Sequence, residues 1–137
     1  MASMAEIVSA VRLHIADFTI PYVYDDETIR SFIINNGLPR TNILIGTNFT
    51  SEDEAIISPE PTGDGKYLIE LATAYAILVK IYNESSGKAI EAKEGSSSIN
   101  LRGQAEFSGK AAQDMNKLIK EVTDRILQNG VSGVYIV

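Results

Sequence analysis

The feature that most constrains the fold is residues 66–85, which have apolar side chains on almost every side of a helix. Helical spacing separates these side chains into two sets: Leu68, Leu71, Ala72, Tyr75, Leu78, Val79 and Tyr82 on one side, and Ile69, Ile77 and Ile81 on the other. Charge is limited to a narrow strip: Lys66, Glu70, Lys80 and Glu84. A helix that is apolar nearly all round needs neighbours on both sides. This segment is therefore predicted to lie in the middle of a core or an assembly.

Three further helices are expected. The first is predicted over residues 1–17, where apolar side chains recur at helical spacing, and it ends before Pro21. Asp25 is the predicted N-cap of a second helix, which Asn36-Gly37 closes and Pro39 prevents from continuing. Residues 107–128 form an amphipathic helix that Asn129-Gly130 terminates. Its predicted inner stripe consists of Phe107, Ala111, Met115, Leu118, Ile119, Val122 and Ile126. The predicted fold is therefore mainly α, a single-domain bundle of about four helices over residues 1–137.

Two segments without helical periodicity separate these helices, and a short tail follows the last one. Residues 38–65 are expected to form a protruding loop or hairpin, residues 86–106 a flexible β-prone connection, and residues 131–137 a strand-like tail. Within the first segment, the β-prone runs 41–45 and 55–57 are candidates for the two arms of a hairpin. Alternatively, 51–54 is a capping-box pattern that would start a single helical turn, stopped by Pro59.

Composition limits the classes of function. The chain has 137 residues, a net charge of −6 and no cysteine, so disulfides and thiolate metal sites are excluded. Its 12 Lys and Arg residues are scattered singly, which argues against tight nucleic-acid binding. No early apolar run resembles a signal peptide or a membrane span. We therefore expect the protein to fold in a cytoplasm, without membrane association.

Patterns that carry chemistry are weak. His14, the only histidine, lies on the apolar side of the first helix and is expected to be packed or half-exposed, with no catalytic role. The acidic clusters 25–27 and 52–54 lack EF-hand spacing and are interpreted as helix capping and a solvated loop, although a carboxylate-based metalloenzyme stays an alternative. Gly-Lys pairs at 65–66 and 87–88 lack the rest of a phosphate-binding loop. We predict no catalytic residues, no metal and no cofactor.

The order of elements provides a resemblance. An opening helix with Arg12 is followed by an Ile-Pro linker and a Tyr-x-Asp-Asp-x-x-Ile-x-x-x-Ile helix over 24–33. An irregular excursion, an alanine-rich helix over 71–82, a serine-rich stretch over 96–102 and a last amphipathic helix complete the order. This order resembles the head–tail connector, or adaptor, proteins of tailed bacteriophages. The long, acidic 38–65 excursion and the 131–137 tail depart from the family pattern.

The resemblance implies a virion structural protein assembled in the host cytoplasm. Such a protein would form a ring of itself, commonly dodecameric, beneath the portal protein, and would bind further connector or tail proteins on its other side. DNA would pass through the lumen without sequence recognition. The acidic net charge is compatible with such a conduit, because it does not trap DNA. The alternative is a small acidic helical module that binds or regulates other proteins without catalysis.

Interface residues are predicted from apolar character in segments expected to lie outside the bundle. The candidates are Ile43, Leu44, Ile45, Phe49, Ile56, Ile57, Ile99, Leu101, Tyr135 and Ile136. An equally open alternative is that some of them fold back and cover the bundle. Tyr75 and Tyr82, one heptad apart, are expected to be core or interface anchors.

Overall fold

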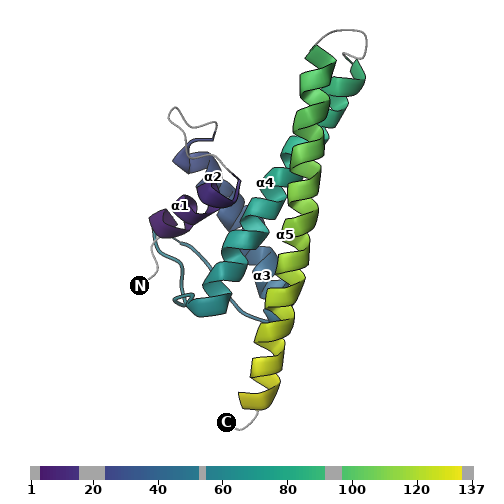
Figure 1. Ribbon diagram of the computed structural model, residues 1–137. Helices are drawn as coiled ribbons and strands as arrows, with labels where there is room; N and C mark the ends of the chain where they lie inside the picture. The colour runs from purple at the N-terminus through teal and green to yellow at the C-terminus, as the bar shows by residue number, and fades with distance from the viewer. Residues whose placement is uncertain (1–3, 16–23, 53–54, 92–96, 134–137) are drawn as a thin grey trace.

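Two long antiparallel helices and a smaller helical layer beside them form the architecture of this computed structural model (Figure 1). It describes the backbone of residues 4–15, 24–52, 55–91 and 97–133, and the side chains within 4–15, 24–52, 55–84 and 109–128. The elements are α1 (Met4–His14), α2 (Asp26–Phe32), the π-helical turn η1 (Ile33–Gly37), α3 (Leu38–Ile45), α4 (Gly63–Glu91) and α5 (Ser97–Gly133). Because α2, η1 and α3 follow one another without a break, the described residues form four helical segments, and the predicted mainly helical fold is confirmed.

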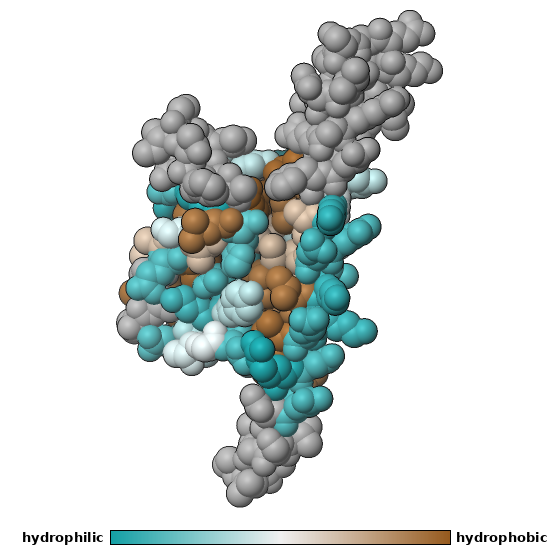
Figure 2. Space-filling view, in the orientation of Figure 1, coloured by the Kyte–Doolittle hydropathy of each residue, from teal (hydrophilic) through white to brown (hydrophobic). Residues whose placement is uncertain are grey.

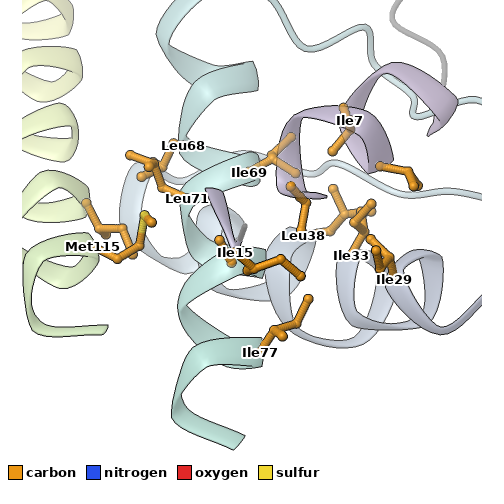
Figure 3. Packing of buried hydrophobic residues seen from close by; sticks show 14 of the residues in the cluster. Ile7, Ile15, Ile29, Ile33, Leu38, Leu68, Ile69, Leu71, Ile77 and Met115 are labelled. Carbon is orange, nitrogen blue, oxygen red and sulfur yellow. The ribbon is translucent and has the colours of Figure 1, made fainter. Parts of the chain in front are cut away.

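Helix α4 lies between α5 on one side and the layer of α1, α2, η1 and α3 on the other (Figure 1). Figure 3 shows Leu68 and Leu71 of α4 directed toward Met115 of α5, and Ile69 directed toward the layer that contains Ile7. All five of these side chains are buried. The position of α4 between two sets of neighbours accounts for its apolar character on nearly every side. The prediction that this helix lies in the middle of the core is confirmed.

Asp25 begins α2 as predicted. Its side chain accepts a hydrogen bond from the backbone N–H of Thr28 at 2.7 Å, and its own backbone is extended. This satisfies one of the N–H groups that have no partner inside the first turn. Hydrogen bonds from Thr28 hold the pKa of Asp25 below its ordinary value, because they stabilise the ionised carboxylate.

The predicted helix end at Asn36-Gly37 is wrong, because the helical backbone continues through η1 into α3. Pro39 stands in the first turn of α3, where its missing N–H is tolerated. The π-helical turn shifts the hydrogen-bond register just before the proline. Gly37 has ordinary helical angles, φ −65° and ψ −52°, and serves close packing: a Cβ there would lie 2.0 Å from Thr73 Oγ1 of α4.

The prediction of a β-strand at 41–45 is also wrong, because these residues belong to α3. Leu38 and Thr41 are buried on its inner side, and Leu44 and Ile45 pack partly against the core. Burial of one helical face outweighs the small intrinsic preference of β-branched residues for strands. Helix α3 ends at Gly46, whose φ of +68° is the left-handed conformation that glycine adopts most easily.

The loop that connects α3 to α4 is irregular over its described residues, 46–52 and 55–62, and parts of it are folded against the core. A single antiparallel bridge joins Thr50 and Ser58, so neither the predicted hairpin with arms at 41–45 and 55–57 nor a helical turn at 51–52 is present. Asn42 closes the loop onto α3: its Oδ1 accepts from Phe49 N at 2.8 Å, and its Nδ2 donates to Phe49 O at 3.0 Å. Phe49 and Ile57 are consequently buried in the core.

The two long helices, α4 and α5, are longer than predicted. Helix α4 continues to Glu91 and α5 begins at Ser97, so helix replaces most of the β-prone connection expected over 86–106. Helix α5 also includes 131–133 of the predicted strand-like tail, whose remaining residues, 134–137, lie outside the described part. Among the described helices, none has the length and apolar content needed to cross a membrane.

Polar contacts link helices within the smaller layer and join α4 to α5. Arg12, which is buried, donates to Tyr24 O at 2.6 Å and pairs with Asp26, linking α1 to the start of α2. Arg125 of α5 forms a two-point ion pair with Asp64 of α4, at 2.9 Å and 2.7 Å. The hydrogen bond from Arg125 lowers the pKa of Asp64, and the same contact raises the pKa of Arg125.

Candidate interaction surface

A groove of about 350 Å³ lies between α4 and α5, partly open to solvent. Tyr75, Val79 and Tyr82 of α4 form one wall, and Gly109 and Ala112 of α5 form part of the other. Tyr75 and Asn83 are eight positions apart on α4, so the groove is about 12 Å long. This volume lies at the lower end of the range of ligand-binding pockets, and the length matches three or four residues of an extended peptide.

The groove's wall depends on a glycine. A Cβ at Gly109 would lie 2.9 Å from the ring of Tyr82, closer than real Cβ contacts. Glycine therefore allows the Tyr82 ring to lie against the backbone of α5, where the side chain is still 43% exposed. A large aromatic surface held in one place and open to solvent is typical of protein interfaces.

Arg40 of α3 lies at one end of the groove. Its guanidinium group is 4.7 Å from the centroid of the Tyr75 ring, and its Nη2 donates to Asn116 Oδ1 at 3.0 Å. Tyr75 and Asn116 face each other at the same end because α4 and α5 are antiparallel. Both of these partners are neutral, so the positive charge of Arg40 is oriented by them without being neutralised.

Side-chain amides complete the groove. Asn83, Gln113 and Asn116 are exposed along its edges, and each provides both a donor and an acceptor. Such groups match the alternating N–H and C=O groups of a peptide backbone. The groove thus combines aromatic surface, amide hydrogen-bonding groups and one oriented cation.

The predicted interface residues whose side chains the structure describes differ in their burial. Ile43 is 83% exposed on the outer side of α3, Ile56 is exposed in the loop, and Leu44 and Ile45 are partly buried. Phe49 and Ile57 are buried, so they do not present surface to a partner in this conformation. The backbone of Ile99 and Leu101 is part of α5 and not a strand, but their side chains, like Tyr135 and Ile136, lie outside the described part.

His14 is half-buried between two residues of α4. Its Nε2 is 3.6 Å from Glu70 Oε1, and its ring lies 6.0 Å from that of Tyr67 at a tilt of 46°. Glu70 therefore faces α1, and Lys66 pairs with Glu6 at 3.1 Å. Among the described residues, no three His, Asp or Glu side chains come together as a possible metal site.

Arg40, Gly109 and Asn116 were missed by sequence reasoning. Arg40 and Asn116 are 76 positions apart, and no local pattern connects residues at that distance. Gly109 offered one available signal, because a glycine inside an amphipathic helix often marks close packing of another group.

Comparisons with protein-family models, with curated proteins and with solved structures found no match for this chain.

Proposed function

We propose that this chain is a structural assembly protein of the tailed-phage head–tail connector type. In this proposal it forms a closed ring beneath the portal and links the portal to further connector or tail proteins in the virion. The ring would contain about twelve copies, the number that the resemblance implies, joined by heterologous contacts. The order of elements in the sequence supports the family, and the surface of α5 supports assembly.

The observation that carries the proposal is the placement of two exposed leucines. Leu118 is 38% exposed and Leu127 is 45% exposed on α5. They are nine residues apart, which at about 100° per residue puts them on opposite sides of the helix. A ring subunit needs two different contact surfaces, one for each neighbour, whereas a twofold dimer needs one. Exposed apolar residues on both sides of α5 are the pattern expected for a ring.

Other surface features agree with an assembly role. Figure 2 shows hydrophobic surface in the middle of one face, between the side that α1 and α2 occupy and the polar outer edge of α5. Leu13 and Ile43 add exposed apolar side chains on α1 and α3. A net charge of −6 suits a channel through which DNA passes without being held.

The test is the mass of the purified chain across a concentration series, by light scattering after size exclusion, alone and with purified portal rings. We expect a discrete oligomer of about twelve copies, or its appearance when portal rings are added. Leu118→Lys and Leu127→Lys should each prevent ring closure on their own, because both contacts are needed. Lys117→Gln, a substitution at the exposed position next to Leu118, is the control. A strictly monomeric chain that ignores portal rings would refute the proposal.

A small acidic module that binds other proteins is the second candidate. The groove beside Arg40 is the observation that favours it, because a single chain carries the whole groove. A stable monomer that binds a peptide would support this function over the ring.

A further inference from the structure

We infer that the groove between α4 and α5 is a docking site for a short acidic segment of a partner protein, with a carboxylate of that segment bound by Arg40. The inference concerns surfaces within one chain, so it does not depend on whether the chain forms a ring. Its first support is the cavity itself, about 350 Å³ in volume and lined by Tyr75, Tyr82 and Ala112.

The chemistry at the Arg40 end selects the charge of the occupant. Arg40 is held from two directions, by the Tyr75 ring at 4.7 Å and by Asn116 at 3.0 Å. These contacts use one face of the guanidinium plane and one of its five N–H donors, and they supply no negative charge. A carboxylate accepts paired N–H bonds from a guanidinium group in a geometry that few other groups match. The segment is therefore expected to carry Asp, Glu or a terminal carboxylate at this end.

The other end of the groove selects an apolar or aromatic side chain. Tyr82 is held against Gly109 and exposes part of its ring, and the neighbouring wall of Val79 and Ala112 is apolar. Tyrosine and arginine are the residue types that most often dominate binding energy at protein interfaces. In this groove, which is about 12 Å long, Arg40 lies near one end and Tyr82 near the other.

The side-chain amides favour a peptide as the occupant. The side-chain amides of Asn83, Gln113 and Asn116 carry donors and acceptors that would pair with the main-chain N–H and C=O groups of a bound peptide, irrespective of its side chains. A segment of three or four extended residues would fill the groove from Arg40 to Tyr82. The partner chemistry is thus a carboxylate followed, about two to three residues away, by an apolar or aromatic side chain.

The test begins with selection of a random heptapeptide library on the immobilised full-length chain. We expect the selected peptides to share an acidic residue and an apolar or aromatic residue at that spacing. Synthetic copies are then titrated by fluorescence polarisation. Replacing the acidic residue with its amide should weaken binding about 10-fold. Amide resonances of Gly109 and Ala112 should shift in NMR spectra of the labelled protein when peptide is added.

Three variants localise the contact. Arg40→Gln should weaken binding of the acidic peptide about 10-fold but leave binding of its amide version unchanged. Lys117→Gln, which removes one positive charge from α5 at a position that does not line the groove, should leave both affinities unchanged. Tyr82→Ala truncates a partly exposed ring and should weaken both peptides, which keeps the test valid if Arg40→Gln lowers the melting temperature.

Several results would overturn the inference. They are no enrichment of any peptide, enrichment of peptides without an acidic residue, or equal effects of Arg40→Gln and Lys117→Gln. Self-association of the wild-type chain that Arg40→Gln abolishes would assign the groove to a second copy instead of a partner protein. Failure of the ring test leaves these peptide measurements unaffected, so the two proposals are separable.

Discussion

Replacing Gly37 with alanine should destabilise the protein, although the backbone there is helical. At φ −65° and ψ −52°, helix propensity alone favours alanine over glycine by about 1 kcal/mol. The new Cβ, however, would lie 2.0 Å from Thr73 Oγ1 and 3.2 Å from Ile69 O. Gly37 and Thr73 are both buried, and Thr73 Oγ1 is fixed by donating to Ile69 O at 2.8 Å. The contact is relieved only if the Thr73 hydroxyl leaves its hydrogen bond or η1 moves away from α4.

The magnitude follows from these terms. Overpacking a close-packed interior costs about 1–3 kcal/mol, and displacing the Thr73 hydroxyl from its hydrogen bond costs about 1 kcal/mol more. After the gain in helix propensity, the net loss is about 2 kcal/mol. For 137 residues the unfolding entropy is about 0.3 kcal/mol/K, so the melting temperature should fall by about 7 °C.

The assay is thermal and urea unfolding followed by circular dichroism. Thr73→Ala removes the clashing oxygen, so Gly37→Ala in that background should cost less than about 1 kcal/mol. Gly65→Ala is the matched control, because its Cβ would meet only Phe49 Cζ at 3.9 Å, an ordinary contact. A melting temperature of Gly37→Ala equal to or above that of the wild type would refute the reasoning. So would the absence of rescue by Thr73→Ala.

Arg12→Ala should cost about 2 kcal/mol in urea unfolding, because a buried stem and the bond to Tyr24 O are lost. Asp26→Asn should cost distinctly less, because the Asp26 side chain is 64% exposed, and equal costs would contradict this account. Asp64 has a lowered pKa in the folded state, so its stabilisation is present above about pH 4 and is lost as the pH falls through the folded pKa. Calorimetry from pH 6 to pH 2.5 should therefore show a shallower acid loss of melting temperature for Asp64→Asn, and parallel curves would exclude this role. Asp25→Ala should lower the melting temperature by a few degrees and Asp25→Ser by less, because serine also accepts the Thr28 N–H; equal losses would show that capping is not the cause.

Local patterns were sufficient for the parts of the fold that depend on neighbours in the chain. The N-cap at Asp25 follows from the side chain and the three positions after it. The inner stripe of α5 was readable from spacing, and Met115, Ile119 and Val122 are buried as expected. Leu118, assigned to the same stripe, lies at its border and is 38% exposed. Spacing shows which side of a helix is apolar. The width of the buried strip on that side depends on how much of it the neighbouring helices cover.

The candidate interaction groove was only partly predictable. Tyr75 and Tyr82 were expected as core or interface anchors, and both line the groove. Arg40 and Asn116 carry no local signal, because they are oriented by a hydrogen bond to each other. This bond joins two helices that are far apart in the sequence. The groove forms where α4 and α5 pack together, and its positively charged end exists only after α3 has packed against this pair.

The sequence by itself determined that the chain is mainly helical, that α4 lies in the centre and that Asp25 starts a helix. Each of these depends on periodicity or on contacts within one turn. Only the tertiary structure decided that residues 38–45 form a helix, that Gly37 packs on Thr73 and that the loop at 46–62 buries Phe49 and Ile57. Intrinsic preferences for strand or helix differ by less than about 1 kcal/mol per residue. Burial against partners distant in the sequence is worth more than that, and it decides the outcome.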